Sequence, residues 1–407
     1  MSRLCVYMLP LSPDYSGAAS ALFDMNGICV MHDASGCTGN YTGYDEPRWL
    51  GSRSAVYCSG LRRMDAIMGN DEKYIQRTIE AAKELRPDLI AFLGSPVPML
   101  IGTDLKGMAM EVENETGIPS FGFDTTGLAY YDKGASDVFL ALAKRFCRKR
   151  TSDSICDQGK TEEQVKKKKV NILGILPIDF GNQGNPQRLF AFVEGLGYEI
   201  NARYGIGSSV DQIQRTTEAD LNIVVSKSGL LVAKYLQKKY DMPYVCGVPV
   251  ADGTFFVERL QRALGGEEPG VQTEKTLTEV QDRKSTAQQA YHRGVLIIHE
   301  QIFANEIREM LSAQTERKIT VATLFGLEQE LAAPQDVDIQ NESEAIREIN
   351  SGKYAYVIAD PEFYRVIHRD DVTLLGLPHV AVSSKLHWDE YMDYLGEDIP
   401  RLIKTIP

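Results

Sequence analysis

The sequence predicts an α/β protein built from three doubly wound domains with parallel sheets. The first observation is a plan that occurs three times, at residues 86–124, 218–249 and 353–384: an apolar strand, a turn and a helical stretch, then an x-Pro pair that opens a second apolar strand. The second is that each copy is preceded by an apolar run leading into a loop and a helix. Short β-branched runs alternating with helical patterns are typical of parallel βαβ units with helices on both faces.

The preceding runs lie, in chain order, at residues 27–37, 170–197 and 294–314. They place the three Rossmann-like domains near 1–150, 170–265 and 290–407, joined by linkers at 151–169 and 266–289. The first linker is polar and dense in charge, and the second opens with glycines and a proline, as linkers commonly do. A chain of 407 residues that is 43% hydrophobic has enough apolar material for several cores.

Charge and hydropathy exclude some classes of partner. The formal net charge is -12, from 44 basic and 56 acidic residues, which disfavours an extended nucleic-acid-binding surface. No run approaches the roughly 18 apolar residues of a membrane span, and two prolines break the short apolar stretch at the N-terminus. We therefore expect a cytoplasmic protein without a membrane or nucleic-acid partner.

The seven cysteines are an odd number, widely scattered and without CxxC or CxxxC spacing. This pattern argues against both a disulfide framework and a zinc knuckle. Cys5, Cys29 and Cys246 lie inside apolar runs and are expected in the core. A metal site would have to be assembled from distant segments or from two chains.

In open parallel sheets, ligands bind beyond the carboxyl ends of the strands. Those ends carry Cys37, Ser95, the loop at 179–185, Ser226 and Asp360. If the three domains face one another, these loops line one shared central cleft.

Cys37 stands in the segment Gly27–Gly43, where an apolar run ends in His32-Asp33 and small residues surround one thiol. A buried free cysteine packed in a glycine-rich turn is one interpretation. The other is a metal ligand: thiolates suit iron–sulfur clusters, and a [4Fe–4S] cube usually takes about four. One chain offers Cys37 and, farther on, Cys58, so two chains related by a two-fold axis would offer four. For Cys58 alone, an ordinary strand or turn thiol is the competing interpretation.

Three weaker motifs remain open. Gly181 and Gly184 lie where a strand gives way to a helix, which would let backbone N–H groups meet an anion, but neither a dinucleotide nor a P-loop pattern is present, so an ordinary turn is the alternative. His387 beside Trp388 is either a ligand or a histidine on a packed aromatic turn. His32-Asp33 is either a proton-handling pair or a turn that hydrogen-bonds its own backbone.

With the three-domain plan and the segment HDASGCTGNYTG in view, the sequence resembles the component 1 (molybdenum–iron protein) family of nitrogenase and its relatives, which include light-independent protochlorophyllide reductase and cofactor-scaffold proteins. The family's His-Gly-x-x-Gly-Cys segment, whose cysteine binds the interface cluster, matches His32 to Cys37 here. The resemblance thus implies a nitrogenase component 1-like fold and nominates Cys37 as a cluster ligand.

The resemblance also shows departures. Where the family supplies further cluster cysteines, this chain has Ser12 and Ser95. Where a second-domain cysteine anchors the catalytic cofactor, it has Ser226, and the cofactor's histidine would fall near His387. These differences argue against dinitrogen reduction and imply a nitrogenase-like protein with fewer cluster ligands.

Two functions follow as expectations. In the first, the chain is a nitrogenase-like oxidoreductase subunit, a homodimer or a heterodimer with a similar subunit. An iron-protein-type ATPase delivers electrons to a [4Fe–4S] cluster shared across the dimer interface and held by Cys37, with Cys58. A substrate is then reduced in the cleft bounded by Ser95, Ser226 and the Gly181–Gly184 loop. In the second, a non-catalytic binding or scaffold protein of the same fold holds a metallocofactor or a tetrapyrrole.

Overall fold

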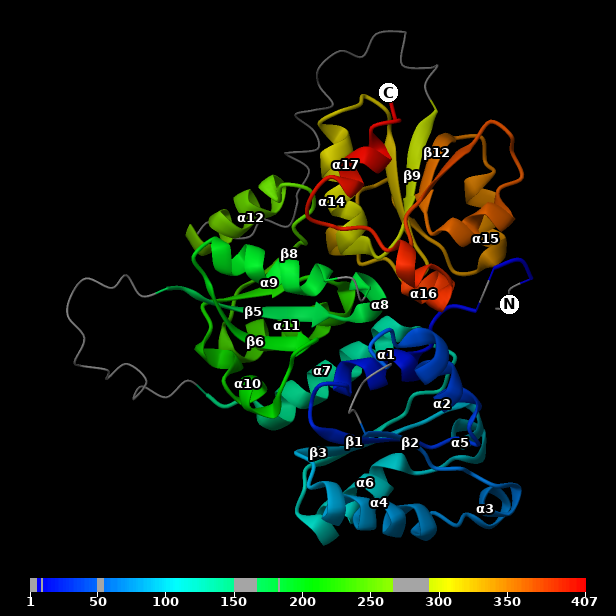
Figure 1. Cartoon of the computed structure of the whole chain (residues 1–407), viewed down its shortest axis with the longest axis vertical. Coiled ribbons are helices and arrows are strands. Elements are labelled where there is room, and N and C mark those ends of the chain that lie inside the picture. The colour runs from blue at the N-terminus through cyan, green and yellow to red at the C-terminus, as the bar shows by residue number, and fades with distance from the viewer. Residues whose placement is uncertain (1–5, 9, 50–54, 150–166, 182–183, 266–292) are drawn as a thin grey trace, which may run out of the picture.

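The computed structural model describes the chain except residues 1–5, 9, 50–54, 150–166, 182–183 and 266–292. It contains three wholly parallel sheets with helices packed on their faces, which confirms the predicted α/β class (Figure 1). The domain boundaries remain predictions, because both predicted linkers fall largely or wholly outside the described residues.

The first sheet has the strand order β2-β1-β3-β4. Its strands β1 and β3 are buried almost throughout, as near-continuous apolar runs covered on both faces are. The elements of this part are α1 (Asp14–Leu22), β1 (Gly27–Met31), α2 (Gly36–Asn40), the π-helix η1 (Tyr41–Asp45), β2 (Ala55–Cys58), α3 (Arg63–Met68), α4 (Glu72–Leu85), β3 (Leu89–Leu93), α5 (Pro96–Ile101), α6 (Leu105–Thr116), β4 (Ser120–Phe123) and α7 (Tyr131–Phe146).

The second sheet has the order β6-β5-β7-β8. Its elements are β5 (Lys169–Ile175), α8 (Pro177–Phe180), α9 (Asn185–Gly195), β6 (Glu199–Gly205), α10 (Val210–Gln214), the 3-10 helix η3 (Thr216–Glu218), β7 (Leu221–Val224), the 3-10 helix η4 (Lys227–Gly229), α11 (Leu230–Tyr240), β8 (Tyr244–Cys246) and α12 (Thr254–Gly265).

The third sheet has the order β11-β10-β9-β12-β13. Its elements are β9 (Gly294–Ile298), α14 (Gln301–Ser312), β10 (Ile319–Thr323), η6 (Gln329–Leu331), β11 (Val337–Asp338), α15 (Glu342–Ile349), β12 (Tyr354–Ala359), η7 (Pro361–Val366), β13 (Thr373–Gly376), α16 (Val380–Ser383), η8 (Ser384–Glu390) and α17 (Asp398–Ile403).

The three parts meet at the middle of the molecule (Figure 1). Helices α1 and α7 cross each other between the first sheet and the rest, α7 also contacts α11 and η4, and α8 contacts α16. One hydrophobic core runs through all three parts, and a smaller one fills the outer face of the first sheet beneath α4 and α6. Among the described residues, no helix combines the length and the apolar character that crossing a bilayer requires.

One predicted strand is wrong. The x-Pro pair at 377–378 was expected to open a strand, but residues Val380–Ser383 form the short helix α16, and the edge strand β13 precedes the proline. The Asp360 carboxylate accepts hydrogen bonds from the His379 backbone N–H (2.8 Å) and the Ser383 hydroxyl (2.7 Å). These two hydrogen bonds hold both ends of α16 to one carboxylate, and this outweighs the β-propensity of its two valines.

Candidate functional site

The strand order of each sheet reverses beside its first strand, between β1 and β3, β5 and β7, and β9 and β12. Such switch points are where doubly wound sheets bind ligands. The residues beyond them are, in the three sheets, Asp33 to Cys37 with Ser95, Asp179 with Ser226, and Glu300 with Asp360.

Asp33 organises the first switch point. It follows β1, and its carboxylate Oδ2 accepts three backbone hydrogen bonds, from Ser35 (3.0 Å), Cys37 (2.8 Å) and Thr38 (3.3 Å). These bonds satisfy N–H groups at the start of α2, which have no partner within the helix. The backbone that carries Cys37 is therefore fixed by one carboxylate.

The carbonyl oxygen of Asp33 holds the end of β2. It accepts hydrogen bonds from the Cys58 thiol (3.3 Å), the Ser59 hydroxyl (3.2 Å) and the Leu61 backbone N–H (2.8 Å). The Gly60 N–H in turn donates to the Cys58 sulfur at 3.3 Å. Cys37 and Cys58 are thus both attached to Asp33, one through its side chain and the other through its main chain.

Cys37 is half-buried, and its thiol has hydrogen-bonding neighbours in Tyr15 of α1 and Ser95, the residue that precedes α5. Burial raises the pKa of the Cys37 thiol, and the negative charge of Asp33 raises it further, whereas the neighbouring hydroxyls of Tyr15 and Ser95 act in the opposite direction. The thiol therefore carries its proton at neutral pH in the metal-free chain, and a bound metal would replace that proton.

The two serines that the resemblance places where the family has cysteines are both buried, and both have protein partners. Ser95 donates to the carbonyl of His32 (3.0 Å), and Ser12 donates to the carboxylate of Asp45 (3.1 Å). Their hydroxyl oxygens retain acceptor capacity, but their donor positions are already used.

Ser226 lies at a second place, the centre where the three parts meet. Its hydroxyl donates to the Gly174 carbonyl at 2.6 Å and is a hydrogen-bonding neighbour of Asp179. Buried side chains fill this centre: the Asp179 carboxylate accepts from Tyr131 and contacts the His379 ring nitrogen at 3.2 Å, while its carbonyl accepts from Tyr391 (2.8 Å). The predicted residues thus form two groups, Cys37 with Cys58 and Ser95, and Ser226 with the 179–185 loop.

Gly181 joins the central group. Its φ is +63°, and a Cβ there would come within 2.7 Å of the Tyr391 ring, so only glycine fits without a shift. Gly184, with φ +90°, precedes α9; the two residues between these glycines lie outside the described residues. His387 belongs to neither group, because its ring contacts the carboxylates of Glu390 (2.8 Å) and Glu362 (3.4 Å), whose hydrogen bonds raise its pKa against the effect of partial burial.

Sequence reasoning did not nominate four residues of the centre, namely His299, Glu300, His379 and Tyr131. His299 and Glu300 follow β9 directly, and the His299 ring stacks on His379 with 4.2 Å between centroids. Their position at a strand's carboxyl end was the available signal. The sequence could not show that these four side chains lie together, because they come from segments far apart in the chain.

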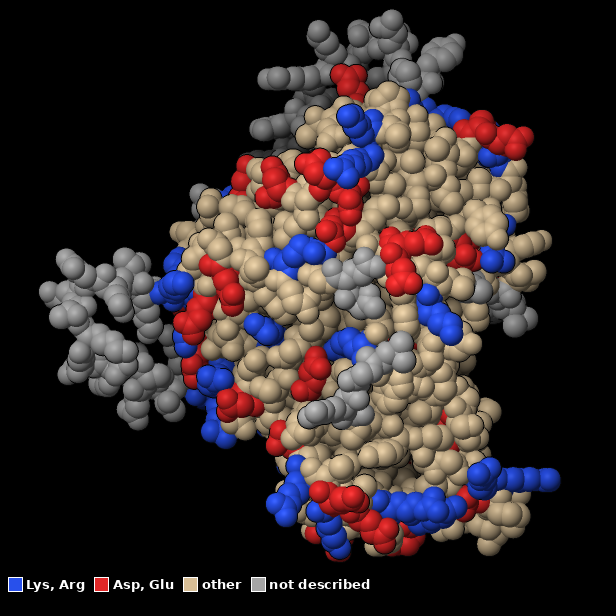
Figure 2. Space-filling model, viewed as in Figure 1, with Lys and Arg blue, Asp and Glu red and all other residues tan. Residues whose placement is uncertain are grey.

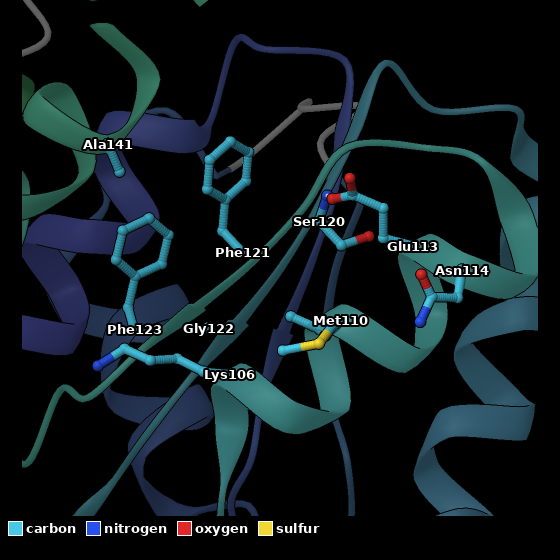
Figure 3. Close-up of a pocket in the computed structure, with 10 residues that line it drawn as sticks. Lys106, Met110, Glu113, Asn114, Ser120, Phe121, Gly122, Phe123 and Ala141 are labelled. Atoms are coloured by element: carbon cyan, nitrogen blue, oxygen red, sulfur yellow. The ribbon is translucent and has the colours of Figure 1, made fainter. Parts of the chain in front are cut away.

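A hollow of about 380 Å³ lies elsewhere, between α6 and the edge strand β4 (Figure 3). Figure 3 shows Met110 and Glu113 of α6 beside Ser120 and Phe121 of β4. The Glu113 carboxylate is already bound to the Ser120 N–H (2.8 Å) and Arg145 (2.6 Å). Neither this hollow nor one lined by Tyr391, Arg401 and Leu402 includes a predicted site residue.

The fold and the site define a class: an α/β protein of three doubly wound sheets with two thiols gathered at the first switch point. Within the described part of the chain, no three His, Cys, Asp or Glu side chains are arranged to hold a metal ion. A model of the family described as nitrogenase component 1 type oxidoreductase matches residues 13–325. The chain belongs to this family, as its resemblance implied.

Similar proteins of known name support the family assignment. The chain is 26% identical over 211 residues to a light-independent protochlorophyllide reductase subunit of Angiopteris evecta, covering 51% of this chain and 41% of the relative. It is 28% identical over 213 residues to the corresponding subunit of Chlorokybus atmophyticus, again covering 51% and 41%. The match thus spans well under half the length of these relatives.

Solved structures support the fold. The chain superposes on nitrogenase Cp1 at pH 5 with a TM-score of 0.67 over 99% of this chain and 88% of that one, at 16% identity. The same protein at pH 6.5 gives a TM-score of 0.65 at 15% identity. The nitrogenase component 1-like fold is therefore confirmed. In this family, iron–sulfur clusters, a partner subunit and an iron-protein-type ATPase are general features.

Proposed function

We propose that this chain is a nitrogenase-like reductase subunit that receives electrons from an iron-protein-type ATPase through an interface iron–sulfur cluster. The observation that carries the proposal is the attachment of Cys37 and Cys58 to one residue, Asp33, at the first switch point. Two thiols that serve only as packing have no need of a common anchor.

The donor set fits a cube shared by two chains. One chain supplies two thiols, and two chains related by a two-fold axis supply four, the usual number for a [4Fe–4S] cluster. When bound, such a cluster would supply one-electron transfer. Cys37 and Cys58 would hold it, giving up their thiol protons, and Tyr15 and Ser95 would cover Cys37 on the protein side.

The surface around the thiols supports a partner subunit. Helices α3 and α5 start beside Asp33 and Cys37, and they expose Ile67 (64%), Met68 (72%) and Leu100 (77%) to solvent. The surface over α2 and α5 is largely free of charged side chains (Figure 2). A second copy of this chain, or a similar subunit, would bury this apolar surface and exclude water from a cluster, which helps to set its potential.

Replacing Leu100 with glutamate is therefore expected to weaken dimer formation at least about tenfold, because a carboxylate would be buried where an apolar side chain was. Sedimentation velocity over a range of concentrations measures this. Met110→Glu is the matched control, since Met110 is also exposed (63%) but lies on α6 beside the hollow of Figure 3. Equal dimerisation of both variants would place the interface elsewhere.

The substrate is proposed to bind in the interdomain cleft bounded by Ser95, Ser226 and the Gly181–Gly184 loop. Tyr131, Tyr391 and His379 fill the space beside Ser226 in this structure. A substrate there would have to displace them, whereas one nearer Ser95 would lie closer to Cys37.

The test is nucleotide-dependent reduction. The anaerobic protein is mixed with an iron-protein-type ATPase, dithionite and MgATP, and the electron paramagnetic resonance spectrum is recorded. A cluster signal from this chain that requires ATP hydrolysis supports the reductase. A protein that holds iron but gains no electron from the ATPase contradicts it.

The second candidate is a non-catalytic protein that holds a metallocofactor or a tetrapyrrole. The observation that favours it is the presence of Ser12, Ser95 and Ser226 at positions where the family supplies cysteines. Such a protein binds its ligand equally with and without the ATPase and nucleotide. Equilibrium binding of protochlorophyllide, followed by fluorescence, distinguishes the two.

A further inference from the structure

We propose that Asp33 is the positioning residue of the cysteine site: its carboxylate fixes the backbone of Cys37 and its carbonyl fixes the thiol of Cys58. The inference rests on the proposed function, because that function gives the two cysteines a cluster to hold. The arrangement around Asp33 itself is given by hydrogen bonds. Asp33 is the second residue of the segment from His32 to Cys37, where the resemblance gives the family a glycine, and the inference assigns a role to this difference.

The geometry requires an acceptor oxygen at this position. Oδ2 alone accepts from Ser35, Cys37 and Thr38 within 3.3 Å, and Asp33 is only 4% exposed. A glycine in place of Asp33 has no side-chain oxygen, so three N–H groups at the start of α2 would lose their acceptor. Ser35, just before α2, has a φ of +140°, a conformation that side chains rarely adopt, and its N–H bond to Asp33 helps to hold it there.

The main chain of Asp33 is equally engaged. Its N–H donates to the Ser59 hydroxyl at 3.1 Å, while its carbonyl accepts from Cys58, Ser59 and Leu61. The loop after β1 and the loop after β2 are therefore cross-linked at one residue. Displacing Asp33 would change the separation of the two sulfur atoms.

The experiment compares Asp33→Asn and Asp33→Ala with the wild-type full-length chain. In metal-free protein, amide hydrogen exchange of peptides from each part of the chain is followed by mass spectrometry. For Asp33→Ala we expect the Ser35, Cys37 and Thr38 amides to exchange at least about tenfold faster, because they lose their acceptor, and for Asp33→Asn we expect a smaller increase, because the amide keeps an acceptor oxygen. The peptide with Cys147, whose thiol contacts the Tyr204 hydroxyl and the Ile213 carbonyl, is the internal control and should not change.

Iron content after anaerobic reconstitution is the second readout. Asp33→Ala is expected to lose most of its iron, and Asp33→Asn is expected to retain more. If wild type binds iron and Asp33→Ala retains it with unchanged amide exchange over residues 35–38, the positioning role is wrong while the cluster stands. If wild type binds no iron but exchange over these residues rises as expected, the cluster is wrong and the role of Asp33 stands. Should Asp33→Ala fail to fold, unchanged exchange over residues 35–38 in Asp33→Asn overturns the proposal, because a neutral oxygen accepts hydrogen bonds more weakly than a carboxylate.

Discussion

Replacing Gly17 with alanine is expected to lower the free energy of unfolding by about 3 kcal/mol, at the upper end of what overpacking a core usually costs. A Cβ at Gly17 would lie 1.9 Å from the Tyr131 carbonyl oxygen, and one at Gly134 would lie 1.9 Å from that of Asp14. The helices α1 and α7 therefore touch backbone to backbone at two glycines. Because backbone atoms cannot rotate away, the added methyl must separate the helices.

The effect should reach the cysteine site, because α1 carries Tyr15, a neighbour of the Cys37 thiol. Urea unfolding followed by circular dichroism gives the midpoint. Gly195→Ala is the matched control, since Gly195 ends helix α9 and a Cβ there meets nothing within 4 Å. That variant is expected to be about as stable as wild type or about 0.5 kcal/mol more stable. Equal midpoints for the two variants would show that α1 and α7 do not cross so closely.

The second large effect is on pH dependence. Burial raises the pKa of Asp179 from its ordinary 3.8 to about 7, and burial together with the charge of Asp179 raises that of Glu300 to about 7. A raised pKa means that the folded protein holds a proton which the unfolded chain has released. This stabilisation is complete below the unfolded pKa and is lost as the pH rises through the folded value. Between about pH 5 and about pH 8, the stability that is lost amounts to roughly 2 to 3 kcal/mol for one such group.

The histidines and tyrosines that face these carboxylates do not change their charge in this interval. Burial lowers the pKa of His379 to about 3 and that of His299 well below its usual range, so both stay neutral. Burial also raises the pKa values of Tyr131, Tyr391 and Tyr394 far above neutrality. The charge of Asp132 also raises the pKa of Asp179, and burial raises the pKa of Asp132 itself against its ion pair with Lys227 of η4 (3.0 Å).

Asp179→Asn should therefore be less sensitive to pH than wild type between about pH 5 and about pH 8, because the amide cannot ionise and no longer repels Glu300. Urea midpoints at intervals across that range test this. Asp389→Asn is the control. Asp389 is exposed on η8, so this substitution removes one carboxylate without changing the buried centre. A wild-type slope that persists unchanged in Asp179→Asn would contradict the assignment.

The sequence was sufficient for the inner strands of the sheets because these are apolar on both faces, whereas outer strands such as β2 and β13 are partly exposed and carry a weaker pattern. Runs such as Leu89–Leu93 and Gly294–Ile298 are buried throughout, and no other element of that length and composition fits between helical patterns. The strand expected after Pro378 was wrong for a tertiary reason, since the carboxylate of Asp360, some twenty residues earlier, accepts hydrogen bonds from both ends of α16. Local propensity contains no information about that bond.

The candidate site was partly predictable for a related reason. Cys37, Ser95 and Ser226 lie where the ends of parallel strands must place them, so position along the chain indicated them. The division into two groups depends on side-chain packing at the centre, where Tyr131 and Tyr391 are buried and hydrogen-bonded to Asp179. The role of Asp33 depends on a contact with Cys58, 25 residues on, through a carbonyl oxygen, which no residue pattern reports.

The most direct measurement is iron and acid-labile sulfide per chain in protein purified without oxygen, for wild type and Cys37→Ala side by side. The proposal predicts roughly two irons per chain in wild type, the value for one four-iron cube shared by two chains, with a cluster resonance on reduction that Cys37→Ala lacks. Iron content unchanged in Cys37→Ala, or no iron in wild type after anaerobic reconstitution, would contradict it and leave Cys37 a structural thiol.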